Sequence, residues 1–210
     1  MRTVRYVGML VVVMTGLLSP VISGRRAEAH TWLEVPEYQQ AYSLSCEFAS
    51  LYMVTSYWGA PIHEVDALAV TSWNSNPHLG FRGDITGAWG STWDYGIYAE
   101  PLADIAMYYG YGADVAYAPE AAVLIDYLDA GIPVIVWLSV QYETGWYEWD
   151  ETGASYRLVP YEHVLVAMGY DDGGVYISDP GPGTYDYLDW DYFLRTWTIM
   201  DGMMLAVYPT

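Results

Sequence analysis

Positive charge is the scarcest property of this sequence. Its 210 residues include no lysine and seven arginines against 26 acidic residues, which gives a formal net charge of −19. Nucleic-acid binding depends on cationic side chains that neutralise phosphates, so this composition excludes a nucleic-acid partner. The acidity itself has two interpretations: attraction of cationic peptides, or a solvated surface adapted to a salty or acidic milieu. We favour the second, because net charge bears on solubility and association more than on chemistry.

Cysteine is almost as rare, since Cys46 is the only one and no disulfide can form within the chain. Exported domains use disulfides freely, so a single unpaired cysteine in such a protein needs an explanation. One explanation is a small buried hydrophobic side chain. The other is a reactive thiol.

Patterns typical of metal or cofactor sites are also lacking. The four histidines are scattered and show no zinc-ligand spacing with the one cysteine. The acidic clusters at residues 171–172 and 186–191 lack the alternating ligand order of an EF-hand loop. We therefore expect no cofactor and no dedicated metal site.

Long apolar runs are confined to the N-terminus. An apolar stretch at residues 7–22 follows Arg2 and Arg5, and residues 27–29 (AEA) offer a small-x-small cleavage site. A membrane-spanning helix needs roughly 20 apolar residues, so this run is short for an anchor. We predict a signal peptide over residues 1–29 and a secreted or cell-envelope domain over residues 30–210, with no stable membrane insertion after cleavage. An uncleaved N-terminal membrane anchor is the alternative.

The remaining residues suit one globular domain, which we expect to be monomeric. Hydrophobic residues make up 53% of the chain and aromatic residues 17%, enough to bury a sizeable core. Apolar spacing predicts helices before an antiparallel sheet, and therefore the α+β class. Helices are expected at residues 46–58, 61–73 (with Pro61 first), 98–109, 119–129 and 190–197. Strands are expected at residues 114–118, 133–140, 163–170, 175–179 and 203–208.

Residues 74–96 form a long predicted loop rich in glycine, asparagine and tryptophan. Loops of this length in compact domains usually have a function. One interpretation is that His78, Arg82 and Asp84 line a cleft, in which Arg82 binds a substrate carboxylate. We favour the alternative in which Arg82 and Asp84 pair and hold the loop together.

An aromatic run in the second half has two interpretations as well. Its side chains either contact an extended peptide or sugar, or pack in the core and at its rim, which we favour. The run consists of Trp137, Tyr142, Trp146, Tyr147 and Trp149.

Three residues together indicate nucleophilic catalysis. Cys46 begins a predicted helix, where unpaired N–H groups and the helix dipole lower a thiol's pKa. His163 begins one predicted strand and Asp179 ends the next, across the turn signal at residues 171–174. Such a hairpin brings the two side chains together. A thiolate needs a base, and the base needs an orienting acceptor.

A fourth candidate precedes the cysteine. Gln40 lies six residues upstream, where its amide could donate to the oxyanion of a tetrahedral intermediate beside the Cys46 N–H. Gln39 competes for this role, and an exposed glutamine without function is the simpler interpretation.

Six stretches carry a resemblance to a known family and follow its order along the chain. They are QAYSLSCEFASLYMV (40–54), NPHLGFRGDITG (76–87), YGIYAEPLADIAMYYG (95–110), LDAGIPVIVWLSV (128–140), EHVLVAMGYDDGGVYISDPGPG (162–183) and FLRTWTIMDGMMLAVY (193–208). The chain resembles the stand-alone C39-like peptidase domains, relatives of the bacteriocin-processing peptidases with a papain-like fold. The combination of SLSCE with EHVLVAMGYDD and ISDP is the most diagnostic part.

The resemblance implies roles for four residues. Cys46 matches the nucleophile, His163 the general base, Asp179 the third member of the triad and Gln40 the oxyanion-hole glutamine. Glu47 departs from the glycine usual in the bacteriocin-processing members, which weakens the implication of their double-glycine leader specificity. The sequence has no ATP-binding P-loop and no transporter span, so their transport role is not implied.

The sequence therefore predicts a secreted cysteine peptidase that hydrolyses peptide or isopeptide bonds through a thioester acyl-enzyme, with a peptide or protein substrate. Acyl transfer to an amine would use the same residues. The alternative from another class is a non-catalytic papain-like module that binds peptide or cell-wall material.

Overall fold

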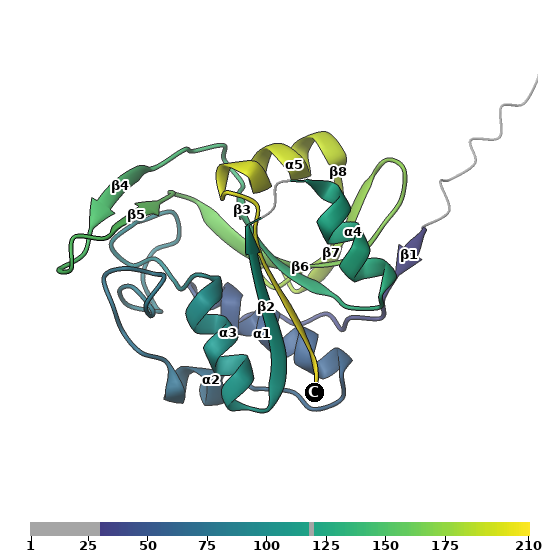
Figure 1. Ribbon diagram of the computed structural model, residues 1–210, viewed down its shortest axis with the longest axis horizontal. Coiled ribbons are helices and arrows are strands. Elements are labelled where there is room, and N and C mark those ends of the chain that lie inside the picture. Colours follow the sequence, from purple (N-terminus) through teal and green to yellow (C-terminus); the bar gives the residue numbers. More distant parts are fainter. Residues whose placement is uncertain (1–29, 118–119) are drawn as a thin grey trace, which may run out of the picture.

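The computed structural model describes residues 30–117 and 120–210 (Figure 1). The predicted signal peptide lies outside the described residues. The helices are α1 (Cys46–Tyr57), α2 (Glu64–Val70), α3 (Ala99–Tyr108), α4 (Ala121–Asp129) and α5 (Trp190–Ile199). The strands are β1 (Thr31–Trp32), β2 (Tyr111–Tyr117), β3 (Val134–Ser139), β4 (Trp146–Trp149), β5 (Ser155–Leu158), β6 (Glu162–Tyr170), β7 (Gly174–Asp179), β8 (Thr184–Asp189) and β9 (Met203–Pro209).

A large antiparallel sheet organises the domain. Its strands follow the order β2-β9-β3-β6-β7-β8, with β1 paired to β6, and every pairing is antiparallel. Strand β8 forms one edge, and all its side chains except that of Leu188 are exposed. Strands β4 and β5 form a separate two-stranded hairpin. Helices that precede an antiparallel sheet confirm the predicted α+β class.

Both faces of this sheet are covered, which explains the continuous apolar runs of its central strands. Figure 1 shows α1, α2 and α3 on one side of the sheet and α4 and α5 on the other. Successive strand side chains point to opposite faces. In β3, Ile135 and Trp137 therefore pack with α1 and α3, while Val134, Val136 and Leu138 pack with α4 and α5.

The structure corrects the predicted second helix. It begins at Glu64 rather than Pro61, after His63 in an extended conformation. The segment before it returns from α1: the Ile62 side chain is buried, and its N–H donates to Thr55 Oγ1 at 2.9 Å. This anchoring holds the backbone away from helical geometry until Glu64.

The aromatic run divides between core and surface. Trp137 is fully buried, whereas 45–68% of the surface of each of the other four residues is exposed. Core packing therefore explains Trp137 only. Trp146, Tyr147 and Trp149 lie on β4 of the hairpin, which the sequence analysis did not predict.

Candidate active site

Helix α1 and a hairpin of the large sheet bring the predicted catalytic residues together. Cys46 is the first residue of α1, which packs against β6. His163 lies in β6 and Asp179 ends β7. The turn between these strands is closed by Asp171, whose Oδ1 accepts from the N–H groups of the two glycines at 173–174.

His163 and Asp179 form a close pair. His163 Nε2 lies 2.6 Å from Asp179 Oδ1, and both side chains are largely buried. Burial alone would raise the pKa of Asp179, but the hydrogen bond and charge of His163, together with the N–H of Gly181, lower this pKa below its usual value. The carboxylate is therefore ionised and fixes the orientation of the imidazole ring.

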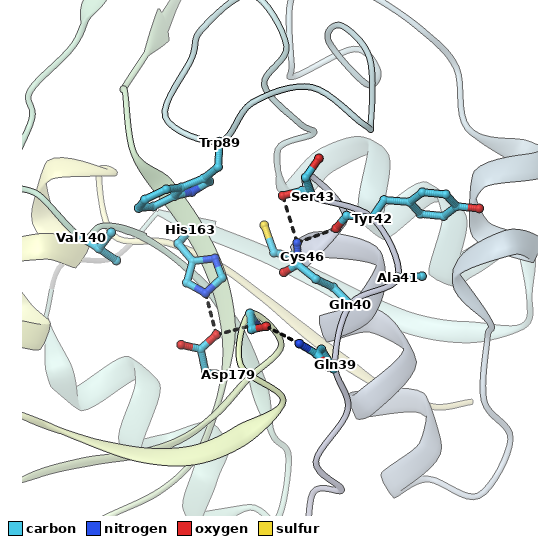
Figure 2. Close-up of a pocket in the computed structure, with 11 residues that line it drawn as sticks. Gln39, Gln40, Ala41, Tyr42, Ser43, Cys46, Trp89, Val140, His163 and Asp179 are labelled. Atoms are coloured by element: carbon cyan, nitrogen blue, oxygen red, sulfur yellow. Dashed lines mark hydrogen bonds and ion pairs between the residues drawn. The ribbon is translucent and has the colours of Figure 1, made fainter.

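A pocket of about 610 Å³ contains all four predicted site residues (Figure 2). Figure 2 shows the ring nitrogen of His163 that does not contact Asp179 on the side of Cys46. The pocket is lined by Gln39, Gln40, Ala41, Tyr42, Ser43, Cys46, Trp89, Val140, His163, Asp179 and Gly181.

The amide of Gln40 is engaged by backbone. Its Nε2 donates to the carbonyls of Tyr42 at 2.7 Å and Ser43 at 3.1 Å. Its Oε1 is buried and has no hydrogen-bond partner among the described residues. To act as an oxyanion donor, this amide must exchange one of its backbone acceptors for the substrate. Gln39, the competing candidate, donates to Gly181 O at 3.4 Å from the same pocket wall.

The surroundings of the thiol differ from the sequence-based expectation. Cys46 is 6% exposed, and its Sγ lies 3.4 Å from Glu47 Oε2. Burial, followed by the charges of Glu47 and Glu162, raises the pKa of Cys46 well above its usual value. The helix N-terminus was expected to lower this pKa, and that expectation is wrong for the arrangement described. In this arrangement burial disfavours the thiolate, and the thiol contacts the carboxyl group of Glu47.

Glu47, Glu162 and Trp89 are site residues that the sequence reasoning missed. Glu47 directly follows the cysteine and Glu162 directly precedes the histidine, each inside an otherwise apolar stretch. Acids in apolar runs were the available signal, because ionisable side chains are seldom fully buried without a reason. Trp89 lines the pocket and donates through Nε1 to the backbone carbonyl of Glu162 at 3.0 Å.

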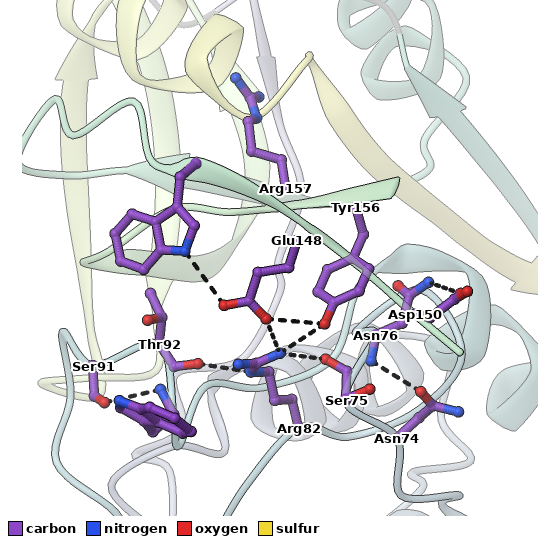
Figure 3. Close-up of polar contacts among 12 residues, drawn as sticks. Asn74, Ser75, Asn76, Arg82, Ser91, Thr92, Glu148, Asp150, Tyr156 and Arg157 are labelled. Carbon is purple, nitrogen blue, oxygen red and sulfur yellow. Dashed lines mark hydrogen bonds and ion pairs between the residues drawn. The ribbon is translucent and has the colours of Figure 1, made fainter. Parts of the chain in front are cut away.

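Arg82 holds the loop that carries Trp89 (Figure 3). Its Nε donates to Thr92 O at 2.7 Å, and its Nη1 contacts Ser75 O at 2.7 Å, Tyr156 Oη at 3.1 Å and Glu148 Oε2 at 3.0 Å. The predicted pairing with Asp84 is wrong. The partner Glu148 comes from β4, so Arg82 joins the loop to the β4–β5 hairpin.

The other two polar candidates of this loop also have local partners. Asp84 Oδ1 accepts from the N–H and hydroxyl of Thr86, and His78 Nδ1 lies 2.9 Å from Glu100 Oε2. None of His78, Arg82 and Asp84 lines the pocket that contains Cys46. The loop contributes to that pocket through Trp89 instead.

Among residues 30–117 and 120–210, no helix has the length and apolar character that a membrane span requires. The same residues contain no group of three or more His, Cys, Asp or Glu side chains arranged to hold a metal ion.

Comparisons with known proteins agree with the fold. Residues 32–204 match the Peptidase_C39 like family. The uncharacterized protein YvpB of Bacillus subtilis (strain 168) is 25% identical over 175 residues, which cover 77% of this chain and 68% of YvpB. A structure described as a C39-like peptidase from Bacillus anthracis superposes with a TM-score of 0.74 at 22% identity, covering 87% of this chain and 98% of that chain.

Two more distant structures share the fold. The peptidase domain of Streptococcus ComA, a bifunctional ABC transporter of a quorum-sensing pathway, gives a TM-score of 0.55 at 17% identity and covers 84% of this chain and 99% of its own. A double-glycine-motif protease from an AMS/PCAT transporter, in complex with its leader peptide, gives 0.53 at 20% identity and covers 86% and 96%. These neighbours establish a papain-like α+β fold.

Proposed function

The chain belongs to the Peptidase_C39 like family, and on that premise we propose that it is a secreted cysteine peptidase that hydrolyses peptide or isopeptide bonds. The observation that carries the proposal is the meeting of Cys46, His163 and Asp179 at one pocket, with the histidine held by the aspartate at 2.6 Å. A nucleophile, a base and an orienting acceptor are the three parts that thiol catalysis requires.

The reaction follows from these positions. The free ring nitrogen of His163 accepts the proton of the Cys46 thiol, and the thiolate attacks the carbonyl carbon of the scissile bond. The C–N bond then breaks, the leaving amine takes the proton from His163, and a thioester remains on Cys46. Water, deprotonated by His163, releases the acid and restores the thiol. Asp179 stabilises the imidazolium without exchanging a proton itself.

The oxyanion would be stabilised by the N–H at the start of α1, which has no partner within the helix, and by Gln40. Gln40 N–H donates to Pro180 O at 2.9 Å, so the backbone links this residue to the strand end that carries Asp179. The side-chain amide would have to leave Tyr42 O or Ser43 O when a substrate arrives.

A peptide substrate is supported by the leader peptide bound to one structural neighbour. The walls contributed by Trp89 and Val140 are apolar, which suits a side chain next to the scissile bond. Glu47, in place of the glycine of the bacteriocin-processing relatives, gives no reason to assign their double-glycine specificity. We propose export through the signal peptide at residues 1–29.

Two observations favour the non-catalytic alternative. Burial raises the pKa of the Cys46 thiol, which contacts Glu47, and the Gln40 amide is engaged with backbone carbonyls. A module that only binds peptide or cell-wall material would tolerate both features.

Hydrolysis of a peptide mixture by the mature chain separates these functions. We expect cleavage products in mass spectra, a transient acyl adduct on Cys46 after acid quenching, and loss of both in Cys46→Ala. The variant should keep the circular dichroism spectrum of the native chain, because the change from CH2SH to CH3 removes a single sulfur atom and therefore little buried volume. Peptide binding without cleavage at any pH between about 4 and 8 would instead identify a binding module.

A further inference from the structure

Two buried carboxyl groups lie beside the proposed nucleophile. Glu47 of α1 is 0% exposed and Glu162 of β6 is 5% exposed. Glu47 Oε2 contacts Cys46 Sγ at 3.4 Å, and its Oε1 accepts from the N–H of Ile97 at 2.8 Å. Glu162 Oε1 has no hydrogen-bond partner among the described residues. The mechanism above uses neither group, although each is adjacent in sequence to a residue of the triad.

The backbone makes room for Glu47 against the thiol. A Cβ at Gly96 would lie 2.0 Å from Glu47 Oε1, and Gly96 has a φ of 148°, which side-chain-bearing residues rarely adopt. The next residue, Ile97, supplies the N–H donor. The carboxyl group is therefore held in a site shaped for it rather than accommodated in spare space.

The groups that face the pair carry little positive charge. The charge of His163 acts on Glu47, the thiol of Cys46 contacts it, and Glu162 interacts with Tyr95 and Tyr98. The two tyrosine hydroxyls lie 2.8 Å apart, and burial raises both their pKa values, so they stay neutral. Among the described residues that act on Glu47, the positive charge comes from the protonated form of His163 itself, while Arg157 acts on the Tyr98 hydroxyl.

Taking Cys46 as the nucleophile of the proposed function, we propose that the buried carboxyl group of Glu47 controls whether the Cys46 thiolate forms. While Glu47 is protonated, its O–H donates to the thiolate across the 3.4 Å contact, and Cys46 ionises against His163. When Glu47 is ionised, the contact reverses: the thiol donates to the carboxylate and stays neutral. Glu47 is thus a positioning residue with a direct effect on thiol ionisation.

The direction of the pH dependence follows from burial. Burial raises the pKa of Glu47 to about 7 and that of Glu162 well above its usual value, the latter also through the charge of Glu47. The thiolate is therefore favoured below about pH 7 and suppressed as the pH rises through that value. We therefore expect peptidase activity to be highest in neutral to acidic surroundings.

Alkylation of Cys46 by iodoacetamide tests the proposal across pH 5 to 8 in the mature chain. Glu47→Gln places an uncharged N–H donor at the contact and mimics protonated Glu47. Removing a neighbouring negative charge lowers a thiol pKa by about one unit or more, which is about tenfold in thiolate. We expect a rate ratio of variant to native chain near one at pH 5 that rises to about tenfold at pH 8.

Glu162→Gln should leave the pH midpoint of alkylation near its native value. Burial and the charge of Glu47 raise the pKa of Glu162 well above its usual value, so this carboxyl group is still protonated while Glu47 titrates, and the amide replaces a group that is already neutral. Glu64→Gln is the control: Glu64 is also 5% exposed, but its Oε1 accepts from the N–H of Ala41 and does not contact the Cys46 thiol. This control should keep the native pH midpoint. A purely structural effect of any variant would change the rate by a factor independent of pH.

Infrared difference spectra give a second readout. A protonated-carboxyl band should be present at pH 6 in the native chain and in Cys46→Ala, and should weaken in Glu47→Gln. A flat rate ratio or a missing band would refute the control of the thiol by Glu47 and would leave the conclusion on peptide hydrolysis, which is measured separately, unchanged. Absent hydrolysis combined with a pH-dependent ratio would instead refute the peptidase function and retain the effect of Glu47 on the thiol.

Discussion

Arg82→Met tests whether this arginine holds the fold or binds substrate. The change removes four polar contacts, two within the long loop at residues 74–96 and two that join this loop to the β4–β5 hairpin. It leaves the carbonyls of Ser75 and Thr92 without their donor and Glu148 without its cation. Methionine retains most of the aliphatic bulk of the arginine, so the loss is mainly polar.

The expected loss follows from burial. Breaking a buried ion pair costs roughly 3–5 kcal/mol. Arg82 is about nine-tenths buried but the Glu148 side chain is 35% exposed, so solvent screens part of the interaction. We therefore expect a loss of about 3 kcal/mol in the free energy of unfolding, or roughly 6–12 °C in Tm for a domain of this size.

Urea unfolding followed by tryptophan fluorescence measures this loss. Arg195→Met is the matched control, because Arg195 pairs with Asp191 on the surface of α5 with both side chains mostly exposed. That variant should lose only about 0.3–0.5 kcal/mol. Asp84→Asn should also be nearly neutral, because Asp84 contacts Thr86 and asparagine retains the acceptor.

A small loss for Arg82→Met, below about 1 kcal/mol, would refute the structural role. If such a variant also showed a raised KM only for substrates with a free carboxylate near the scissile bond, Arg82 would be a substrate ligand. The double variant with Glu148→Gln adds a test, since direct contact requires the two losses to be non-additive.

Four further results are expected. His163→Ala should lose nearly as much activity as Cys46→Ala, while Asp179→Ala should retain more, because the aspartate orients the base without exchanging protons; turnover measured on one peptide ranks the three variants. Gln40→Ala should lower turnover by roughly 10²–10³ but leave alkylation of Cys46 nearly unchanged, because alkylation forms no oxyanion, and equal losses in both assays would contradict the role. Amino-terminal sequencing of secreted protein should begin at or within a few residues of His30, whereas an intact Met1 would favour the anchor. Thermal midpoints should rise from low to molar salt, because salt screens the repulsion among the acids, and a flat series would mean local neutralisation.

The elements that could be predicted from the sequence are those with dense apolar patterns. Helix α1 begins at Cys46 as predicted, and β3, β6 and β9 lie within a residue or two of the predicted strands. Strands β4 and β8 were missed because their side chains are largely exposed and polar or aromatic, so no buried face imposed a period. Strand β5 has two buried side chains, Tyr156 and Leu158, but four residues are too few to show a clear alternation. Their pairing depends on tertiary contacts that local propensity does not encode.

The candidate site divides in the same way. A hairpin of known length was enough to bring His163 near Asp179, because register follows from the turn. The partner of Arg82 lies 66 residues further along the chain, and no local pattern indicates Glu148. The direction in which the pKa of the thiol moves was predicted wrongly, because it depends on burial and on where the Glu47 side chain points, which is determined by Gly96 and Ile97 rather than by residues next to Glu47 in the sequence.

The exposed edge strand β8 has a consequence for how copies of the protein behave in solution. An open strand edge offers unpaired N–H and C=O groups to another chain, and many proteins protect such edges with lysine. This chain has no lysine, and β8 instead carries two exposed tyrosines and two exposed aspartates in the sequence TYDYLD. Charge repulsion between aspartates must then keep two edges apart. The molar salt that stabilises each folded molecule should therefore also promote edge-to-edge aggregation. Resistance to aggregation should be greatest at a lower ionic strength than thermal stability.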